Sequence, residues 1–216
     1  MDSANKAKKP FLLYLSHYAI HTPIMADNRF VQKYLDAGLE PVEAKYASLI
    51  EGMDKSLGDI MNYLKEKNID KNTIIIFLSD NGGLSAHTRG GVPLNTHNTP
   101  LRSGKGSAYE GGIRIPFIVK WPGITKESST NDNNIIIEDI FPSVLSMAGI
   151  KSHNEVQKLD GKSLVPLLKQ KKVKNDSYFY WHYPHVWGPD GPALKLYSAI
   201  RQGDWKLIYF HEDLHF

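Results

Sequence analysis

The clearest pattern in the chain is a stripe of apolar residues at steps of three and four. Its members are Tyr46, Leu49, Ile50, Met53, Leu57, Ile60, Met61 and Leu64. This spacing predicts one helix of about five turns with a single apolar face, and Pro41 suits its first turn. A shorter helix is predicted just before it, with Asp27 as its N-cap and Gly38 at its end.

Two apolar runs of strand length flank these helices. They are Phe11–Ser16 and Thr73–Leu78, and the second is mostly β-branched. The order strand, helix, helix, strand favours a parallel pair of strands and an α/β fold. His17 and His21 follow the first run, and Ser79–Gly82 follows the second. Because the carboxyl ends of parallel strands meet at one rim, we expect these polar residues to lie near each other.

The amino-acid composition of the second half of the chain changes along its length. The glycine-rich stretch 82–123 is long enough to predict an ordered, functional loop. A domain boundary is placed near Val173, where lysines give way to aromatic strands that include one hairpin. The expected elements are a strand at Pro116–Trp121, a helix at Ile140–Met147, a helical turn at Leu164–Leu168, and strands at Tyr178–Tyr183, Leu196–Arg201 and Trp205–Phe210.

Composition excludes several classes of protein. The formal net charge of +3 gives no reason to expect a nucleic-acid partner. No apolar run approaches the ~20 residues that cross a bilayer, so no membrane partner is expected either. The absence of cysteine excludes disulfides and thiolate metal sites. Met1 is followed by polar residues instead of a signal sequence, so we expect any export signal to lie upstream.

An ordered set of motifs carries a resemblance to a known family. The set consists of His21-Thr22-Pro23, Ser79-Asp80-Asn81-Gly82, Leu101–Pro116, Lys120–Gly123, Glu138–Pro142 and Arg201–Ile208. Together the motifs resemble the type I, formylglycine-dependent sulfatases, the arylsulfatases of the alkaline-phosphatase superfamily. The resemblance implies that residues 1–172 are the C-terminal part of the sulfatase α/β domain, a partial sheet with flanking helices. Residues 173–216 would then begin a small, truncated C-terminal subdomain of antiparallel strands.

The resemblance also implies roles for four residues. Asp80 and Asn81 would be calcium ligands, Lys105 would contact the sulfate group, and His21 would help the leaving group depart. A divalent cation and fixed cationic donors suit the charge that develops during sulfate-ester cleavage. An amide oxygen at Asn81, where the zinc enzymes of the superfamily place histidine, favours calcium over zinc.

Two further histidines are candidates for substrate binding. His97 lies in the glycine-rich loop, and His185 lies in an aromatic segment after residue 173. Aromatic surfaces with histidine suit sugar rings, but packing in the core or at a sheet edge explains both residues equally well.

The nucleophile of the family has no counterpart in this chain. It is a formylglycine made from Cys or Ser in a Cys/Ser-x-Pro-x-Arg motif, and Asn98–Arg102 copies only the spacing. We therefore expect a sulfatase fragment that is inactive alone, binds calcium weakly, and self-associates through exposed sheet edges. The full-length parent is expected to be a periplasmic or secreted sulfuric ester hydrolase acting on a sulfated small molecule or carbohydrate.

Two alternatives stay open. One is a phosphoester or phosphonate hydrolase of the same superfamily, which activity on phosphate rather than sulfate esters would reveal. The other is a non-catalytic carbohydrate-binding remnant, which the absence of a formylglycine motif upstream would support.

Overall fold

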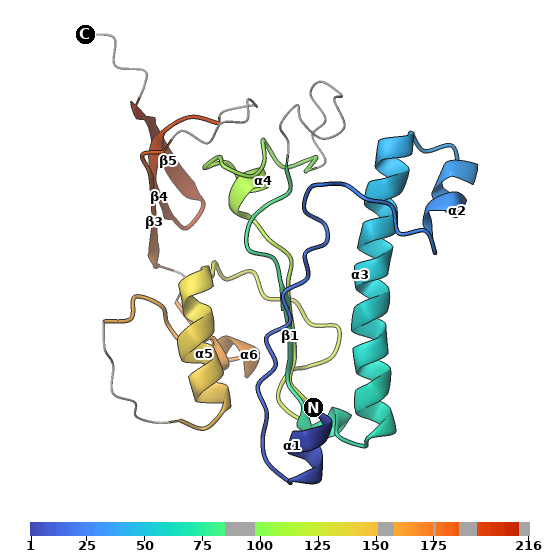
Figure 1. Cartoon of the computed structure of the whole chain (residues 1–216). Helices are drawn as coiled ribbons and strands as arrows, with labels where there is room; N and C mark the ends of the chain where they lie inside the picture. Colours follow the sequence, from blue (N-terminus) through green and yellow to red (C-terminus); the bar gives the residue numbers. More distant parts are fainter. Residues whose placement is uncertain (85–97, 151–157, 175, 186–193, 212–216) are drawn as a thin grey trace. The chain divides into compact units, whose positions relative to one another are not determined.

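The computed structural model describes residues 1–84, 98–150, 158–174, 176–185 and 194–211 (Figure 1). The chain divides into two compact units, residues 1–68 and residues 69–216. None of the helices in these described ranges combines the length and apolar character needed to cross a bilayer.

The first unit contains three helices, α1 (Asp2–Lys6), α2 (Val31–Asp36) and α3 (Pro41–Glu66). Pro41 is the first helical residue of α3, as predicted. Gly38, with a φ of 83°, follows α2 and confirms the predicted end of that helix. The N-cap prediction is wrong, because Phe30 occupies that position and Asp27 instead accepts hydrogen bonds from Arg29.

The predicted strand at Phe11–Ser16 is also wrong. These residues have no strand conformation, and Leu12 and Tyr14 are 82% and 87% exposed. An apolar run supplies the side chains of a strand, but a strand also needs a neighbouring backbone for its ladder. Among the described strands none pairs with this segment, so the predicted parallel pair does not form.

The second unit begins with a 3₁₀ turn, η1 (Asp70–Asn72), and a two-stranded sheet. Strand β1 (Ile75–Leu78) pairs antiparallel with β2 (Phe117–Lys120), so that Leu78 lies opposite Phe117. Both strands fall within the predicted ranges. The residues between them include α4 (Glu110–Ile113), a single helical turn.

A buried serine connects the next helices of this unit. The turn η2 (Ile137–Asp139) leads into α5 (Ile140–Met147), and α6 (Val165–Leu168) follows later. The Ser143 hydroxyl donates to the Asp139 carbonyl at 2.5 Å and accepts the Leu164 N–H at 2.8 Å. Asp139 in turn accepts the Lys162 N–H at 2.7 Å. Helix α5 thereby holds the chain that enters α6.

The unit ends in a three-stranded antiparallel sheet of β3 (Tyr178–Tyr183), β4 (Tyr197–Gln202) and β5 (Trp205–Phe210), in that order. Gly203 has a φ of 55°, which suits the first position of a two-residue hairpin loop. The predicted hairpin is therefore confirmed, while the domain boundary near Val173 stays a prediction. One face of the sheet buries Phe179, Tyr197 and Ala199.

Candidate functional site

The segment that follows β1 carries the predicted cation ligands. Strand β1 ends at Leu78, and the Ser79 hydroxyl donates to the Asn81 carbonyl at 3.0 Å. Asp80 is exposed and Asn81 is half-buried. The turn therefore presents an exposed carboxylate at the end of β1.

The Lys105 segment is joined to this turn by backbone hydrogen bonds. The Lys105 N–H donates to the Gly83 carbonyl at 2.9 Å, and the Gly82 N–H donates to the Gly112 carbonyl at 2.9 Å. Lys105 itself is half-buried. The structure thus brings the segments of Asp80, Asn81 and Lys105 together, while their roles stay predictions.

Close backbone approach explains why glycines occupy this contact. A Cβ on Gly82 would lie 1.9 Å from the Gly111 carbonyl oxygen, and one on Gly112 would lie 2.4 Å from the Gly104 carbonyl oxygen. Neither glycine is among those with positive φ, so the reason is space and not backbone conformation. A larger residue at Gly82 would force the two segments apart, and one at Gly112 would distort the Lys105 segment itself.

Asn98 has a structural function that the sequence did not reveal. Its side-chain amide donates to the Gly83 carbonyl at 2.8 Å and to the Ser103 carbonyl at 3.1 Å. The amide therefore connects the end of the β1 turn to the Lys105 segment. The sequence showed Asn98 only as an imitation of the nucleophile motif, because a side-chain bond to a distant carbonyl leaves no spacing pattern.

His21 lies in the first unit and is shaped by near neighbours in sequence. Its Nδ1 lies 2.9 Å from the Thr22 carbonyl oxygen, and its ring meets the Tyr18 ring edge-on at 5.7 Å. A carbonyl oxygen can only accept, so this contact is a hydrogen bond in the Nδ1–H tautomer; the Thr22 hydroxyl also lies 3.4 Å from Nδ1. Because His21 belongs to the first unit and Ser79–Gly82 to the second, their expected closeness stays a prediction.

The two histidines expected to bind substrate differ in what can be said of them. His97 lies outside the described residues. His185 is exposed just after β3, with its ring 5.7 Å from the Tyr183 ring and nearly perpendicular to it. A role for His185 in substrate binding stays a prediction.

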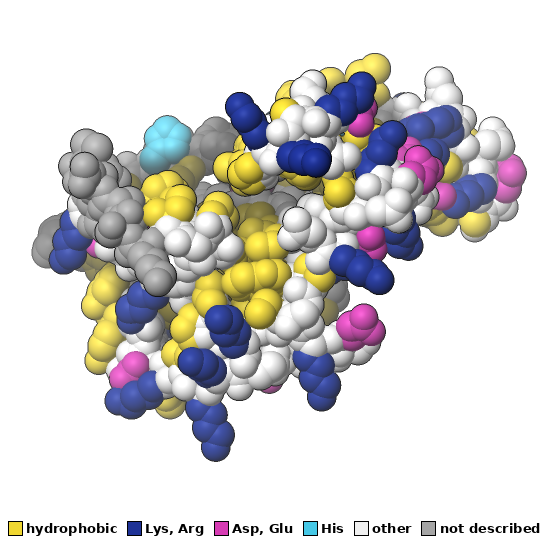
Figure 2. Space-filling view, turned by 90° about the horizontal axis from the view of Figure 1, so that it is seen from below, with side chains coloured by type: hydrophobic (Ala, Val, Ile, Leu, Met, Phe, Trp, Pro, Cys, Tyr) yellow, Lys and Arg dark blue, Asp and Glu magenta, His cyan; other side chains and the backbone are white. Residues whose placement is uncertain are grey.

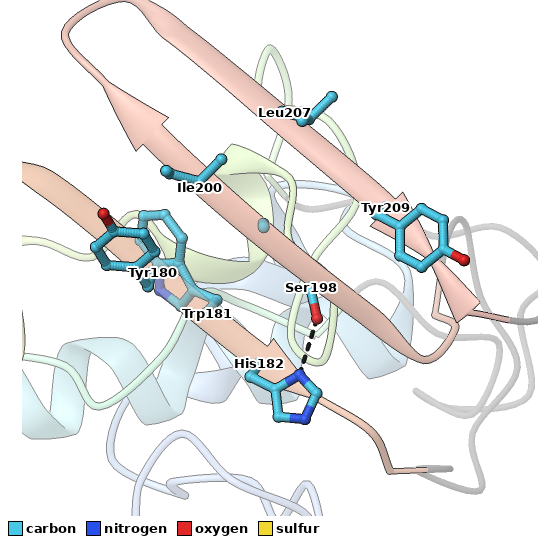
Figure 3. A pocket seen from close by; sticks show the side chains of 8 residues that line it. Tyr180, Trp181, His182, Ser198, Ile200, Leu207 and Tyr209 are labelled. Carbon is cyan, nitrogen blue, oxygen red and sulfur yellow. Dashed lines mark hydrogen bonds between the residues drawn. The ribbon is translucent and has the colours of Figure 1, made fainter.

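The outer face of the β3–β5 sheet holds a polar chain that the sequence analysis also missed. The His182 Nδ1 lies 2.8 Å from the Ser198 hydroxyl (Figure 3), which lies 3.0 Å from the His211 Nε2. Ser198 is the cross-strand partner of His182 in the β3–β4 pair, and no short turn in the sequence indicates the register of that pair. A groove of about 330 Å³ surrounds them, lined also by Tyr180, Trp181, Ala199, Ile200, Leu207 and Tyr209.

The donors available for a metal ion are few. Within the ranges that the structure describes, three or more His, Asp or Glu side chains do not gather in one place. Asp80 and Asn81 offer oxygen donors, which suit calcium, but calcium takes about six to eight oxygens. These two residues therefore fit a calcium site without completing it.

Comparison with known proteins gives the family. The Sulfatase family model matches residues 1–150, and the N-sulphoglucosamine sulphohydrolase C-terminal model matches residues 104–216. A sulfatase from Formosa agariphila is 32% identical over 98% of this chain and 40% of its own length. N-acetylgalactosamine-6-sulfatase from Mus musculus is 32% identical over 81% of this chain and 33% of its own length.

A solved structure supports the same assignment. The crystal structure of Ps i-CgsB in complex with k-i-k-neocarrahexaose has a TM-score of 0.80 and 29% identity, covering 97% of this chain and 44% of that one. The chain thus spans less than half the length of these relatives. The likeness confirms the predicted fold, part of an alkaline-phosphatase-like α/β architecture with a small antiparallel sheet at its C-terminal end. As its ordered motifs predicted, the chain belongs to the sulfatase family.

Proposed function

We propose that this chain supplies the cation-binding and sulfate-binding part of a sulfatase that acts on sulfated carbohydrates. The observation that carries the proposal is the pair of backbone hydrogen bonds joining the Asp80–Asn81 turn to the Lys105 segment. A sulfate ester bound beside a divalent cation needs both charges in one place. Family membership and the carbohydrate named with a related solved structure support the substrate class.

Each proposed role follows from the chemistry of the side chain. Asp80 and Asn81 would hold calcium, which when bound polarises the sulfate ester. The Lys105 ammonium would hold a sulfate oxygen, since a fixed cation close to an anion forms a charge-assisted hydrogen bond. His21, when both ring nitrogens carry protons, would keep Nδ1 turned to the Thr22 carbonyl and donate the Nε2 proton to the leaving oxygen. Export to the periplasm or beyond is part of the same proposal.

The 216-residue chain offers a direct first test. It contains no cysteine and no Ser-x-Pro-x-Arg motif, so we expect the purified chain not to hydrolyse 4-nitrophenyl sulfate. Turnover that disappears in a Lys105→Ala variant would contradict the proposal that the nucleophile lies elsewhere. Calorimetry should show calcium binding weaker than about 1 mM, in the range of incomplete sites.

A second test separates the sulfatase from its alternatives. The chain would be fused to an N-terminal sulfatase segment that carries a Cys-x-Pro-x-Arg motif, and sulfate, phosphate and phosphonate esters would be compared. We expect sulfate esters to be hydrolysed fastest. A preference for phosphate or phosphonate supports the rival hydrolase, and oligosaccharide binding without hydrolysis supports the carbohydrate-binding remnant.

Self-association completes the proposal. Large apolar side chains are exposed in both units, with Leu12 82%, Trp205 86% and Leu207 69% exposed. Figure 2 shows hydrophobic side chains reaching the surface of one face among Lys and Arg side chains. Exposed apolar area of this kind favours association. Sedimentation velocity at rising concentration should therefore show oligomers, and a monomer at the highest concentration would contradict this part of the proposal.

A further inference from the structure

An ion cluster joins α4 to the C-terminal hairpin. The Glu110 carboxylate accepts hydrogen bonds from Arg201 Nη1, at 3.3 and 3.2 Å, and from Lys206 Nζ. Arg201 and Lys206 are cross-strand neighbours on β4 and β5. The bonds span 91 and 96 residues of sequence, so the cluster is a long-range connection.

Lys206 also contacts the residues that precede Glu110 in the chain. Its ammonium donates to the Ala108 carbonyl at 3.0 Å and lies 5.4 Å from the centre of the Trp181 ring. Ala108 is 1% exposed and belongs to one buried cluster with Tyr197 and Ala199. The hairpin therefore binds residues 108–110 through a carbonyl, a carboxylate and an apolar contact.

The charges of Lys206 and Arg201 determine whether the Glu110 carboxyl group is ionised. Burial alone would raise the pKa of this carboxyl group. The hydrogen bond from Lys206, with the charges of Lys206 and Arg201, outweighs burial and holds the pKa below its ordinary value of 4.5. Glu110 is thus ionised at neutral pH, when its bonds to both cations are strongest.

The segment held by this cluster is the one that carries Lys105. Within residues 104–112, the Ser107 N–H donates to the Gly104 carbonyl and the Gly112 N–H donates to the Tyr109 carbonyl, so the segment forms a compact turn. The other side of this turn makes the backbone bonds to Gly82 and Gly83 described above. One turn of nine residues therefore contacts both the hairpin and the proposed calcium-binding segment.

We propose that Glu110 is the positioning residue for Lys105, and that Arg201 and Lys206 are its partners on the hairpin. By fixing residues 104–112 against β4 and β5, the cluster sets where the Lys105 ammonium lies relative to Asp80 and Asn81. The role of Lys105 in this inference rests on the proposed function. The cluster also gives the Arg201–Ile208 motif a structural role, because the sulfate chemistry alone assigns no role to these residues.

Hydrogen exchange measured by NMR on the ¹⁵N-labelled 216-residue chain tests the coupling. In Glu110→Gln we expect the Lys105 and Gly82 amides to exchange about tenfold faster than in the wild type, because the turn opens locally. Amides in the middle of α3 should not change. The matched control is Glu127→Gln, which neutralises an exposed glutamate, and it should leave the Lys105 amide unchanged. Equal exchange in Glu110→Gln and the wild type would overturn the proposal.

A pH profile supplies a readout that a general loss of stability would not produce, and its wild-type part needs no variant to fold. The Lys105 amide chemical shift in the wild type should follow the titration of Glu110 below pH 4.5, and this dependence should vanish in Glu110→Gln. A flat profile in the wild type would overturn the proposal.

A sulfate titration separates this inference from the proposed function. Sodium sulfate is added at constant ionic strength, with sodium chloride as the control salt. A saturable shift at Lys105, weakened several-fold in Glu110→Gln, supports both. The exchange and pH effects could be observed while sulfate causes no shift at Lys105 in the wild type. That result would overturn the sulfate contact of Lys105 and support the mechanical coupling through Glu110.

Discussion

Two candidate site segments of this protein are held in opposite ways. Around His21 the named bonds are local, since the Tyr18 hydroxyl donates to the Thr22 carbonyl and the His21 N–H donates to the Tyr18 carbonyl, and contacts to α3 lie at the ends of the loop, at His17 and Asp27. The Lys105 turn is bonded to residues far away in sequence, including Gly83 and the β4–β5 hairpin. Local bonds fix the shape of a loop, whereas only long-range bonds fix its place in the fold. Damage to long-range contacts should therefore cost more.

The largest effect is expected at Gly82. Its replacement by alanine would put a Cβ 1.9 Å from the Gly111 carbonyl oxygen, so the two segments must separate. We expect Gly82→Ala to lower the free energy of unfolding by about 3 kcal/mol, at the upper end of overpacking effects. Urea denaturation followed by circular dichroism measures this change.

The matched control is a glycine in α3 of the first unit. A Cβ on Gly58 would meet nothing within 4 Å, and alanine favours a helix interior over glycine. Gly58→Ala should therefore raise stability by about 0.5–1 kcal/mol. Equal destabilisation by both alanines would show that the close approach at Gly82 is not decisive.

The next largest effect contrasts two serines of α5. Ser143 accepts the Leu164 N–H, 21 residues away, whereas Ser146 donates only to the Pro142 carbonyl in its own helix. Ser143→Ala leaves a buried N–H without its partner and should cost about 2 kcal/mol. Ser146→Ala should cost less than about 0.5 kcal/mol, because Ser146 is exposed. Thermal unfolding of the two variants compares them, and similar losses would refute the distinction.

A smaller effect should appear as a pH dependence. The pKa of Glu110 lies below 4.5, with burial opposing the shift and Lys206 and Arg201 causing it. A carboxylate with a lowered pKa stabilises the fold above its ordinary pKa and loses that contribution as pH falls through the folded value. Stability should therefore fall below pH 4.5 more steeply in the wild type than in Glu110→Gln, as urea midpoints measured from pH 7 to pH 3 would show.

Asp27 provides the local counterpart of this pH effect. Its pKa is lowered to about 2, mainly by the hydrogen bond from Arg29, two residues away. The Arg29 side chain is 59% exposed, so solvent screens the pair. The Asp27 side chain itself is only 16% exposed, so screening weakens but does not remove its pH effect, and that effect should extend to lower pH, towards about 2. An unchanged pH dependence in Asp27→Asn would show that solvent screening removes the contribution of this local pair.

The smallest effect is expected on the surface of α3. Lys55 and Asp59 form an ion pair of 2.6 Å one turn apart, and both side chains are largely exposed. Asp59→Asn should cost about 0.3–0.5 kcal/mol. Because salt screens exposed charges, the difference should disappear in about 1 M sodium chloride. A difference that persists at high salt would indicate a contribution beyond the ion pair.

The elements that sequence predicted well are those whose cause is local. Helix α3 follows from its apolar period and Pro41, and the β4–β5 hairpin follows from the turn at Gly203. The resemblance of the motifs to sulfatases identified the family. The apolar run at Phe11–Ser16 misled the prediction, because composition does not specify which backbone will pair with a strand.

The parts of the site that sequence missed depend on contacts across long stretches of chain. The motifs marked Asp80, Asn81 and Lys105 as candidates, and the glycine-rich stretch 82–123 predicted an ordered loop. Neither indicated that Asn98 would bond to Gly83 or that Glu110 would meet the hairpin. Such partners are specified by the folded geometry, and a side chain's own neighbours in sequence carry no trace of them.

The burial of Lys206 has a practical consequence for chemical footprinting. Its side chain is 14% exposed, and its ammonium is engaged by Glu110 and by the Ala108 carbonyl. An acylating reagent needs an open approach and an available lone pair, so it should modify this lysine far more slowly than Lys174, whose side chain is 85% exposed. The labelling rate of Lys206, followed by mass spectrometry, would therefore report how often the β4–β5 hairpin separates from residues 104–112.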